Sequence, residues 1–296
     1  MNAEQWKSEG QLIEVNGFKH FVVDSDTEKP CLLILHGYPS CTYDFHKTLP
    51  FLAAHYRVVM HDHLGFGYSN KPSNYSYSLM EQTDQALMLW CKLGIKEGTV
   101  LAHDYGTSIA TELLARRERH VYSEFKIKQM VLCNGSMHVE LAQLRLIQKL
   151  LLNRWSGPWA AKLASRHTLA RNLKNIYFDS SQITDTEIDA LWQMMTFNQG
   201  RKVLHKTTQY IKQRYTYWYR WIGALQSTDL PIHIIWAKDD PVAVVEMATT
   251  LQHEITHSRL TLLEKLGHFP MLEAPERWSN AVINSLAKQI QLKNAD

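Results

Sequence analysis

The sequence predicts an α/β protein with a mostly parallel, doubly wound sheet and a helical segment inserted between two of its strands. Short apolar runs alternate with helical patterns from residue 42 onward. This alternation is typical of a parallel sheet with helices on both faces. Strand signals then vanish between residues 136 and 225, where Leu, Trp, Met and Tyr are frequent. The 296 residues suffice for one such domain with an insertion, although length alone would also permit two domains.

Eight runs have the length and apolar character of strands. They lie at residues 11–15, 18–23, 31–35, 57–61, 99–103, 129–134, 232–237 and 259–263. The first two are separated only by Asn16 and Gly17, which predicts an antiparallel hairpin at one edge of the sheet. Strand 31–35 is apolar throughout, as expected of a strand buried on both faces.

Helix boundaries are marked by capping signals. Ser78 and Glu81 form a Ser-x-x-Glu pattern at the start of one helix, and Thr184 and Glu187 repeat the spacing within the insertion. The last helix is expected to begin at Pro275. The resulting division is a first core part over 1–135, a helical cap over 136–225 and a second core part over 226–296. Such an insertion would cover the carboxyl ends of the strands, where open α/β sheets bind ligands.

The centre of the run from residue 100 to 110, Asp104, is the most informative position in the chain. An apolar strand leads into Ala102-His103-Asp104-Tyr105-Gly106, and a helical pattern follows. This is the layout of a nucleophile elbow, the strand–turn–helix motif that raises one side chain above the sheet. Ser108 lies in a second, serine-like pattern, but that turn would fall inside the following helix. Asp104 is therefore the preferred nucleophile.

A carboxylate at this turn specifies a different chemistry from a serine. A carboxylate attacking an acyl group would form a reactive anhydride, whereas displacement at a saturated carbon forms an ordinary ester. Asp104 therefore indicates the opening of an epoxide or the expulsion of a halide rather than the hydrolysis of an ester or amide.

Backbone amides near the attacked group are needed to hold an oxyanion. His36-Gly37-Tyr38-Pro39 follows the buried strand 31–35, so the amide of Tyr38 would lie at the top of the sheet. The amide of Tyr105 is the second expected donor.

A general base and its orienting acid are expected after the last two strands. His268 lies in the Gly-flanked loop Leu266-Gly267-His268-Phe269-Pro270 and suits a base that activates water. Asp240 is the expected acid, with the neighbouring Asp239 as the alternative. The order Asp104, Asp240, His268 matches the chain order of the α/β-hydrolase triad.

These motifs resemble the epoxide hydrolase and haloalkane dehalogenase branch of the α/β-hydrolase superfamily, over roughly residues 19 to 286. The glycine-containing segment Asp62-x-x-Gly65-x-Gly67-x-Ser69 adds to the resemblance, with Asp62 expected to brace its loop. Within this branch the chain is similar to the mesoderm-specific transcript family of vertebrates. The segments that carry this similarity are 103–106, 147–151, 209–214, 220–225, 232–233 and 240–242.

The resemblance implies a cap tyrosine that protonates the epoxide oxygen. Trp218-Tyr219-Arg220 is similar to the signature of such a tyrosine, with Tyr217 in place of an Asn. Tyr219 is therefore the candidate proton donor, although Tyr215, Trp218, Tyr219 and Ile222 also fit one packing face of a helix. Tyr177 and Tyr210 are the other candidates. Together with His36 and Trp218, they are expected to contact the substrate.

Two departures disfavour a dehalogenase. Those enzymes usually hold halide with a Trp directly after the nucleophile and with an Asn or a second Trp elsewhere. Here Tyr105 follows the nucleophile, and Tyr38 stands where the Asn often lies.

Composition limits the classes of partner. The net charge is +3 and no basic run suggests a nucleic-acid footprint. Four widely spaced cysteines predict neither a disulfide framework nor, with the histidines, a metal site. Residues 1–10 lack the apolar core of a signal peptide, and no apolar run is long enough to span a membrane. We therefore expect a cytoplasmic protein without cofactor or metal. The oligomeric state stays open, a homodimer included.

The sequence thus predicts a hydrolase that acts on a small or medium apolar electrophile, with epoxide hydrolysis first. The alternatives are a haloalkane dehalogenase and a lactone-processing hydrolase. A non-catalytic ligand-binding or interaction module on the same fold is the alternative of another class.

Overall fold

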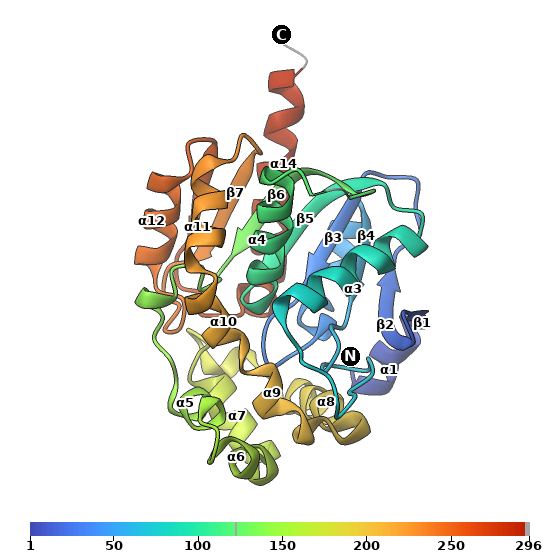
Figure 1. Ribbon diagram of the computed structural model, residues 1–296, viewed down its shortest axis with the longest axis vertical. Helices are drawn as coiled ribbons and strands as arrows, with labels where there is room; N and C mark the ends of the chain where they lie inside the picture. The colour runs from blue at the N-terminus through green and yellow to red at the C-terminus, as the bar shows by residue number, and fades with distance from the viewer. Residues whose placement is uncertain (122, 294–296) are drawn as a thin grey trace.

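The predicted mostly parallel sheet is confirmed. The computed structural model describes residues 1–121 and 123–293 and contains one eight-stranded sheet in the order β1-β2-β4-β3-β5-β6-β7-β8 (Figure 1). Only β1–β2 and β2–β4 pair antiparallel. The strands are β1 (Gln11–Val15), β2 (Phe18–Asp24), β3 (Cys31–Leu35), β4 (Arg57–His61), β5 (Glu97–His103), β6 (Lys126–Cys133), β7 (Ile232–Ala237) and β8 (Ser258–Leu263).

Helices cover both faces of the sheet because the central strands are apolar on both sides. Within β3, Leu33 and Leu35 belong to one hydrophobic cluster, whereas Leu32 and Ile34 belong to the other. The first cluster includes residues of α3 (Leu79–Lys92), α4 (Tyr105–Glu118), α11 (Trp218–Ser227) and α12 (Val245–Glu254). The second includes residues of α1 (Ala3–Ser8), α2 (Leu49–Ala53), α13 (Pro270–Glu273) and α14 (Pro275–Lys293).

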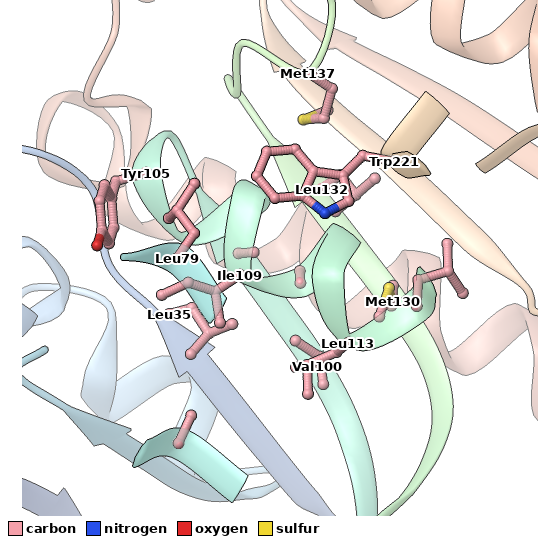
Figure 2. Packing of buried hydrophobic residues seen from close by; sticks show 14 of the residues in the cluster. Leu35, Leu79, Val100, Tyr105, Ile109, Leu113, Met130, Leu132, Met137 and Trp221 are labelled. Atoms are coloured by element: carbon pink, nitrogen blue, oxygen red, sulfur yellow. The ribbon is translucent and has the colours of Figure 1, made fainter. Parts of the chain in front are cut away.

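The first cluster anchors the helix that follows the elbow. Ile109 and Leu113 of α4 are buried near Leu35, Val100 and Leu132 of the central strands, and Trp221 of α11 packs in the same cluster (Figure 2). Gly106 permits close contact between α4 and β3, because a Cβ atom there would lie 2.3 Å from the backbone oxygen of Leu35. The start of α4 is therefore fixed against the sheet.

Helices fill the segment between β6 and β7, as predicted. They are α5 (Leu146–Leu152), α6 (Gly157–Leu163), α7 (Arg166–Lys174), α8 (Asp185–Thr196), α9 (Leu204–Thr207), α10 (Tyr210–Thr216) and α11, with short 3-10 turns at 139–141, 180–182 and 197–202. A further 3-10 turn at 42–45 follows β3. Helices α5 to α9 lie beyond one end of the sheet, whereas α11 packs beside α4 (Figure 1).

Three boundary signals act as expected. The Ser78 side chain accepts a hydrogen bond from the backbone N–H of Glu81, Thr184 and Glu187 form a reciprocal capping box, and α14 begins at Pro275. No helix in the two described ranges has the length and apolarity to cross a bilayer.

Candidate active site

Asp104 lies alone in the turn between β5 and α4. Its backbone has φ +44° and ψ −106°, a conformation that non-glycine residues rarely adopt. The hydrogen bond from its N–H to the Cys133 carbonyl (3.2 Å) and the tight α4–β3 contact at Gly106 hold this strained turn in place. The turn has the geometry of a nucleophile elbow.

The loop after β3 presents a backbone donor to the Asp104 carboxylate. The N–H of Tyr38 donates to Oδ2 of Asp104 at 2.9 Å. Tyr105 is the first residue of α4, so its N–H belongs to the group of helix-end amides without an intrahelical acceptor. Of the two amides predicted from the sequence, that of Tyr38 bonds the Asp104 carboxylate.

His268 lies between two carboxylates. Its Nδ1 is 2.7 Å from Oδ2 of Asp240, and its Nε2 is 4.0 Å from Oδ2 of Asp104. Asp239 instead accepts a hydrogen bond from the backbone of Lys265 through its own Oδ2. Asp240, and not Asp239, is thus the carboxylate that orients His268.

Three neighbours hold the Asp240 carboxylate, and the sequence did not predict one of them, Asn134. The amides of Val242 and Ala243 donate to its Oδ1 at 2.7 and 3.0 Å, and Nδ2 of Asn134 donates to its Oδ2 at 2.7 Å. Asn134 follows β6 directly, and its φ of +41° is tolerated better by Asn than by most residues. That position after a strand was the only signal that could have identified it.

The charge of the site favours a protonated His268. Burial by itself lowers the pKa of this imidazole, but the carboxylates of Asp240, Asp104 and Asp44 outweigh burial and raise it to about 9. His103 shows the opposite effect, because burial lowers its pKa to about 4. A neutral His103 can donate from Nε2 to the backbone carbonyl of His268, 2.8 Å away, which links the elbow strand to the His268 loop.

Arg214 is a buried cation beneath the elbow that sequence reasoning missed. Its Nη2 donates to the backbone carbonyl of Asp104 at 2.8 Å and lies 3.8 Å from Oδ1 of that residue. Its Nε donates to Oγ of Ser108 at 2.8 Å, and its guanidinium lies over the ring of Tyr210. Ser108 is therefore buried in the second turn of α4 with its hydroxyl engaged, which disfavours the serine-elbow alternative.

Asp44 is a second buried group that sequence reasoning missed. It lies in the 3-10 turn after β3, and the Ser40 hydroxyl donates to its Oδ2 at 2.5 Å. Burial raises the pKa of Asp44 well above its ordinary value, and this effect exceeds the opposing hydrogen bond from Ser40. Asp44 lies close enough to His268 and Asp104 for their charges to influence its pKa.

Asp104, His268 and Tyr38 line a cavity of about 840 Å³ that is partly open to solvent. Most of its wall comes from the helices inserted between β6 and β7. The apolar part of that wall includes Ile147, Leu151, Leu169, Leu173, Ile176 and Leu204. The polar side chains Arg145, Gln148, Ser165, Thr168 and Asn172 complete the insertion's contribution. The cavity therefore suits a largely apolar molecule.

The structure corrects the assignment of Tyr219. Its side chain is 86% exposed, in the first turn of α11 on the outside of the molecule. The apparent helical face from Tyr215 to Ile222 is interrupted, because α10 ends at Thr216 and α11 begins at Trp218. Trp221 and Ile222 are buried in the core instead. Tyr219 cannot reach a substrate bound at Asp104.

Trp218 and His36 also lie outside the cavity wall. Trp218 donates from Nε1 to Glu140 at 2.9 Å and packs beside Tyr219. His36 is fully buried, with Nδ1 2.8 Å from the Gly37 carbonyl and Nε2 accepting from the His63 amide at 3.0 Å. It braces the loop that carries Tyr38 and does not contact the substrate site.

Tyr177 and Tyr210 are both buried close to the triad, but neither lines the cavity, so the structure does not show the predicted substrate contact for either. Tyr177 packs on Phe269, next to His268, while its neighbour Ile176 lines the cavity. Tyr210 lies between the rings of Tyr38 and Tyr105. Burial, followed by the charge of Asp104, raises the pKa of Tyr210 well above its ordinary value. Asp62 braces its loop as predicted, because its carboxylate accepts hydrogen bonds from Thr42 and from the amide of Tyr68.

Comparison with known proteins agrees with the observed fold. Residues 30–275 match the family described as alpha/beta hydrolase fold. The chain belongs to the α/β-hydrolase family. It is 35% identical to the putative hydrolase LipZ of Mycobacterium tuberculosis, over 96% of this chain and 98% of that protein.

Two further relatives complete the comparison. The mesoderm-specific transcript protein of Mus musculus is 32% identical over 93% of this chain and 85% of its own length, which confirms the predicted similarity to that family. The crystal structure of a loop variant of the haloalkane dehalogenase DbeA from Bradyrhizobium elkanii superimposes with a TM-score of 0.78 at 19% identity. It covers 95% of this chain and 98% of the other, and the likeness extends to the fold.

Proposed function

We propose that this α/β-hydrolase uses Asp104 as a nucleophile and acts through an alkyl-enzyme ester, with epoxides as its substrates. The observation that carries the proposal is a carboxylate on a strained elbow, with the Tyr38 amide on one of its oxygens and His268 4.0 Å away. A serine in that turn would attack acyl carbon, whereas a carboxylate attacks saturated carbon productively.

The two carboxylate oxygens have different roles in the first step. Oδ2 is held by the Tyr38 amide, so Oδ1 is the oxygen available for attack. Oδ1 forms a bond to a ring carbon while the bond from that carbon to the epoxide oxygen breaks. The electron pair of the broken bond goes to the epoxide oxygen, which takes a proton from an acid. The product of this step is an ester between Asp104 and the substrate.

Water completes the reaction in the second step. Formation of the ester removes the Asp104 charge, one of the causes of the raised His268 pKa, so His268 loses its proton at this stage. Neutral His268 then removes a proton from a water molecule, which attacks the carbonyl carbon of the ester. Oδ2 carries the negative charge of the tetrahedral intermediate and is stabilised by the Tyr38 amide, 2.9 Å away in the free enzyme. The bond between Cγ and Oδ1 breaks, and protonated His268 gives its proton to the departing diol oxygen. Asp104 is left as a carboxylic acid, whose proton returns to the phenolate formed in the first step. Asp240 keeps His268 in the required orientation.

Tyr210 is the acid that this proposal assigns to the epoxide oxygen. Its ring lies between those of Tyr38, whose amide bonds Oδ2, and Tyr105, and its raised pKa keeps its hydroxyl protonated near neutrality. The hydroxyl of Tyr38 is already paired with Thr208 at 2.7 Å. Among the tyrosines predicted from the sequence, Tyr210 is therefore favoured over Tyr219.

Residues 136–225 serve in this proposal as the cap that selects the substrate. They supply most of the cavity wall, including Ile147 and Leu151 from α5 and Leu169 and Leu173 from α7. The apolar character of these side chains supports a small or medium apolar epoxide.

A substrate panel with isotope labelling tests the proposal. Epoxides, chloro- and bromoalkanes, lactones and activated esters are offered to the parent enzyme and to Asp104→Asn. We expect diol formation from epoxides by the parent enzyme alone. A single turnover in ¹⁸O-labelled water should leave the heavy oxygen on Asp104, because water attacks the enzyme ester. Halide release, preferential ester or lactone hydrolysis, label on Ser108, or ligand binding without turnover would each contradict the proposal.

A further inference from the structure

Five large apolar side chains are exposed on the first two helices of the insertion and on the turn that joins them. They are Leu146, Leu150, Trp155, Trp159 and Leu163, each between 41% and 78% exposed. We call this set the α5–α6 surface. Leu146 and Leu150 are four residues apart on α5, and Trp159 and Leu163 are four apart on α6, so each pair shares one helix face. The two helices contact each other, and the set therefore forms one exposed area rather than scattered residues.

This surface lies in a segment whose charged side chains are all basic. The sequence from Leu141 to Phe178 contains no Asp or Glu but seven Lys and Arg residues. Only Arg166 among the seven forms an ion pair with the residues that the structure describes. The unpaired cations are Arg145, Lys149, Arg154, Lys162, Arg171 and Lys174. Arg154 lies over the ring of Trp155, and Lys162 lies over the ring of Trp159, so cations border the exposed aromatics directly.

We infer that the α5–α6 surface binds the surface of an anionic phospholipid membrane. Exposed Trp and Leu bordered by Lys and Arg are characteristic of helices that lie in a membrane interface. Tryptophan favours that interface because its ring is apolar and its N–H can remain hydrated. The basic side chains add attraction to acidic headgroups. Such binding needs no spanning helix, because the helices lie on the membrane and do not cross it.

Charge also argues against a second copy of the chain as the occupant. A twofold dimer through this surface would place the same patch on both partners. The unpaired cations of one copy would then face those of the other, with no acid in either segment to compensate them. A surface that presents many negative headgroups fits the observed charge better.

The α5–α6 surface lies near the cavity that contains Asp104, so membrane binding would affect how the substrate reaches the enzyme. Helices α5, α6 and α7 lie at the end of the molecule opposite the last turns of α14 (Figure 1). Ile147 and Leu151 line the cavity from the same helix that exposes Leu146 and Leu150. Helix α5 therefore lies between the cavity and the proposed membrane contact, so membrane binding would bring the cavity close to the lipid. Only this consequence rests on the proposed function; membrane binding does not.

Co-sedimentation of the full chain with vesicles tests the inference without measuring turnover. Vesicles of phosphatidylcholine alone are compared with vesicles that also contain phosphatidylglycerol. We expect the protein to sediment with the anionic vesicles and less with the neutral ones. Trp155→Ala combined with Trp159→Ala should abolish most of the binding. Tyr219→Ala is the matched control, because it removes an exposed aromatic ring outside α5 and α6.

Two double variants, each lacking two lysine charges, test whether basic side chains contribute to membrane binding. Lys149→Gln combined with Lys162→Gln should weaken binding to anionic vesicles about thirtyfold, since each cation near such a surface contributes about 1 kcal/mol. Lys126→Gln combined with Lys128→Gln changes the net charge equally at the far end of the sheet and should have little effect. Unchanged thermal unfolding of all four variants shows that the fold is intact.

Three results would overturn the inference. The first is that the parent protein pellets equally with and without anionic vesicles. The second is that the tryptophan variant binds these vesicles as the parent does. The third is that the parent binds no vesicles and is a dimer in analytical ultracentrifugation, whereas the tryptophan variant is a monomer. An inactive enzyme that still binds anionic vesicles through Trp155 and Trp159 would contradict the proposed function and support this inference.

Discussion

The guanidinium of Arg214 holds the elbow of Asp104 from below, with Nη2 2.8 Å from the backbone carbonyl of that residue and 3.8 Å from its Oδ1. Oδ1 is the oxygen that the proposed mechanism leaves free to attack. The same guanidinium bonds Ser108 in the next turn of α4. Arg214 therefore positions both the backbone of the turn and the attacking oxygen.

Replacing Arg214 should slow formation of the ester as well as destabilise the fold. Arg214→Met removes two buried charged hydrogen bonds, which we expect to lower the free energy of unfolding by about 2–4 kcal/mol. A displaced Oδ1 should slow ester formation by about 10- to 100-fold. Denaturant unfolding and single-turnover kinetics measure the two effects.

Arg220→Met is the control for Arg214→Met. Arg220 pairs with buried Glu112 through Nε and Nη2, away from Asp104. We expect this variant to lose stability while the folded enzyme forms the ester at the parent rate. An equal fall in that rate for both variants would show that Arg214 acts only through stability.

The pKa of His268 predicts how stability depends on pH. Burial lowers this pKa, but Asp240 and the other carboxylates raise it to about 9, above the ordinary 6.5. Protonated His268 therefore stabilises the fold fully below about pH 6.5, and this contribution is lost as the pH rises through about 9. It should amount to at most about 3 kcal/mol.

Denaturant unfolding between pH 6 and pH 10 measures this contribution. The stability difference between the parent and His268→Gln should shrink across that range. His253→Gln, which replaces an exposed histidine in the last turn of α12, should show no such trend. A difference for His268→Gln that stays constant with pH would refute the raised pKa.

Tyr210 and Tyr219 should respond oppositely to loss of their hydroxyls. Tyr210→Phe keeps the ring between Tyr38 and Tyr105 but removes the proposed acid, so epoxide opening should slow by about 100-fold or more. Tyr219→Phe alters a side chain on the outside of α11 and should leave the rate unchanged. Rapid-quench measurement of ester formation separates the two. A slow Tyr219→Phe variant would restore the assignment made from the sequence.

Gly106 should tolerate no side chain, in contrast to Gly223. A Cβ at Gly106 would lie 2.3 Å from the Leu35 carbonyl, so Gly106→Ala should force α4 away from β3 and cost about 1–3 kcal/mol. Gly223 lies in α11 with open space where its Cβ would be, so Gly223→Ala should stabilise the helix by up to about 1 kcal/mol. Urea midpoints of the two variants should therefore move in opposite directions.

The sequence predicted the sheet well because each strand is a short apolar run bounded by turns. All eight strands form near their expected bounds, and the 11–15 and 18–23 runs pair as a hairpin. The elbow and the His268 loop were also visible, because each lies directly after a strand. A motif that directly follows a strand can be predicted from the sequence, because the end of the strand fixes the position of the motif at the edge of the sheet.

The missed residues Arg214 and Asp44 had no such signal. Arg214 bonds a segment distant in the sequence, Asp44 bonds Ser40 within its own loop, and nothing in a local pattern distinguishes either from a surface residue. Asn134 does follow a strand directly, but its bond to Asp240 joins segments distant in the sequence. Tyr219 was misassigned because the resemblance of Trp218-Tyr219-Arg220 to a family signature does not fix where the side chain points, and the structure places it on the outside of α11. Tertiary contacts decide these positions.

Intact-protein mass spectrometry of His268→Gln with an epoxide substrate tests the central claim most directly. Asp104 and Tyr38 remain in this variant, so the ester should form, but no base activates water to hydrolyse it. We expect a mass gain equal to the mass of the epoxide, and peptide mapping should place it on Asp104. An unchanged mass in His268→Gln, at a substrate concentration that the parent enzyme turns over, would contradict nucleophilic attack by Asp104.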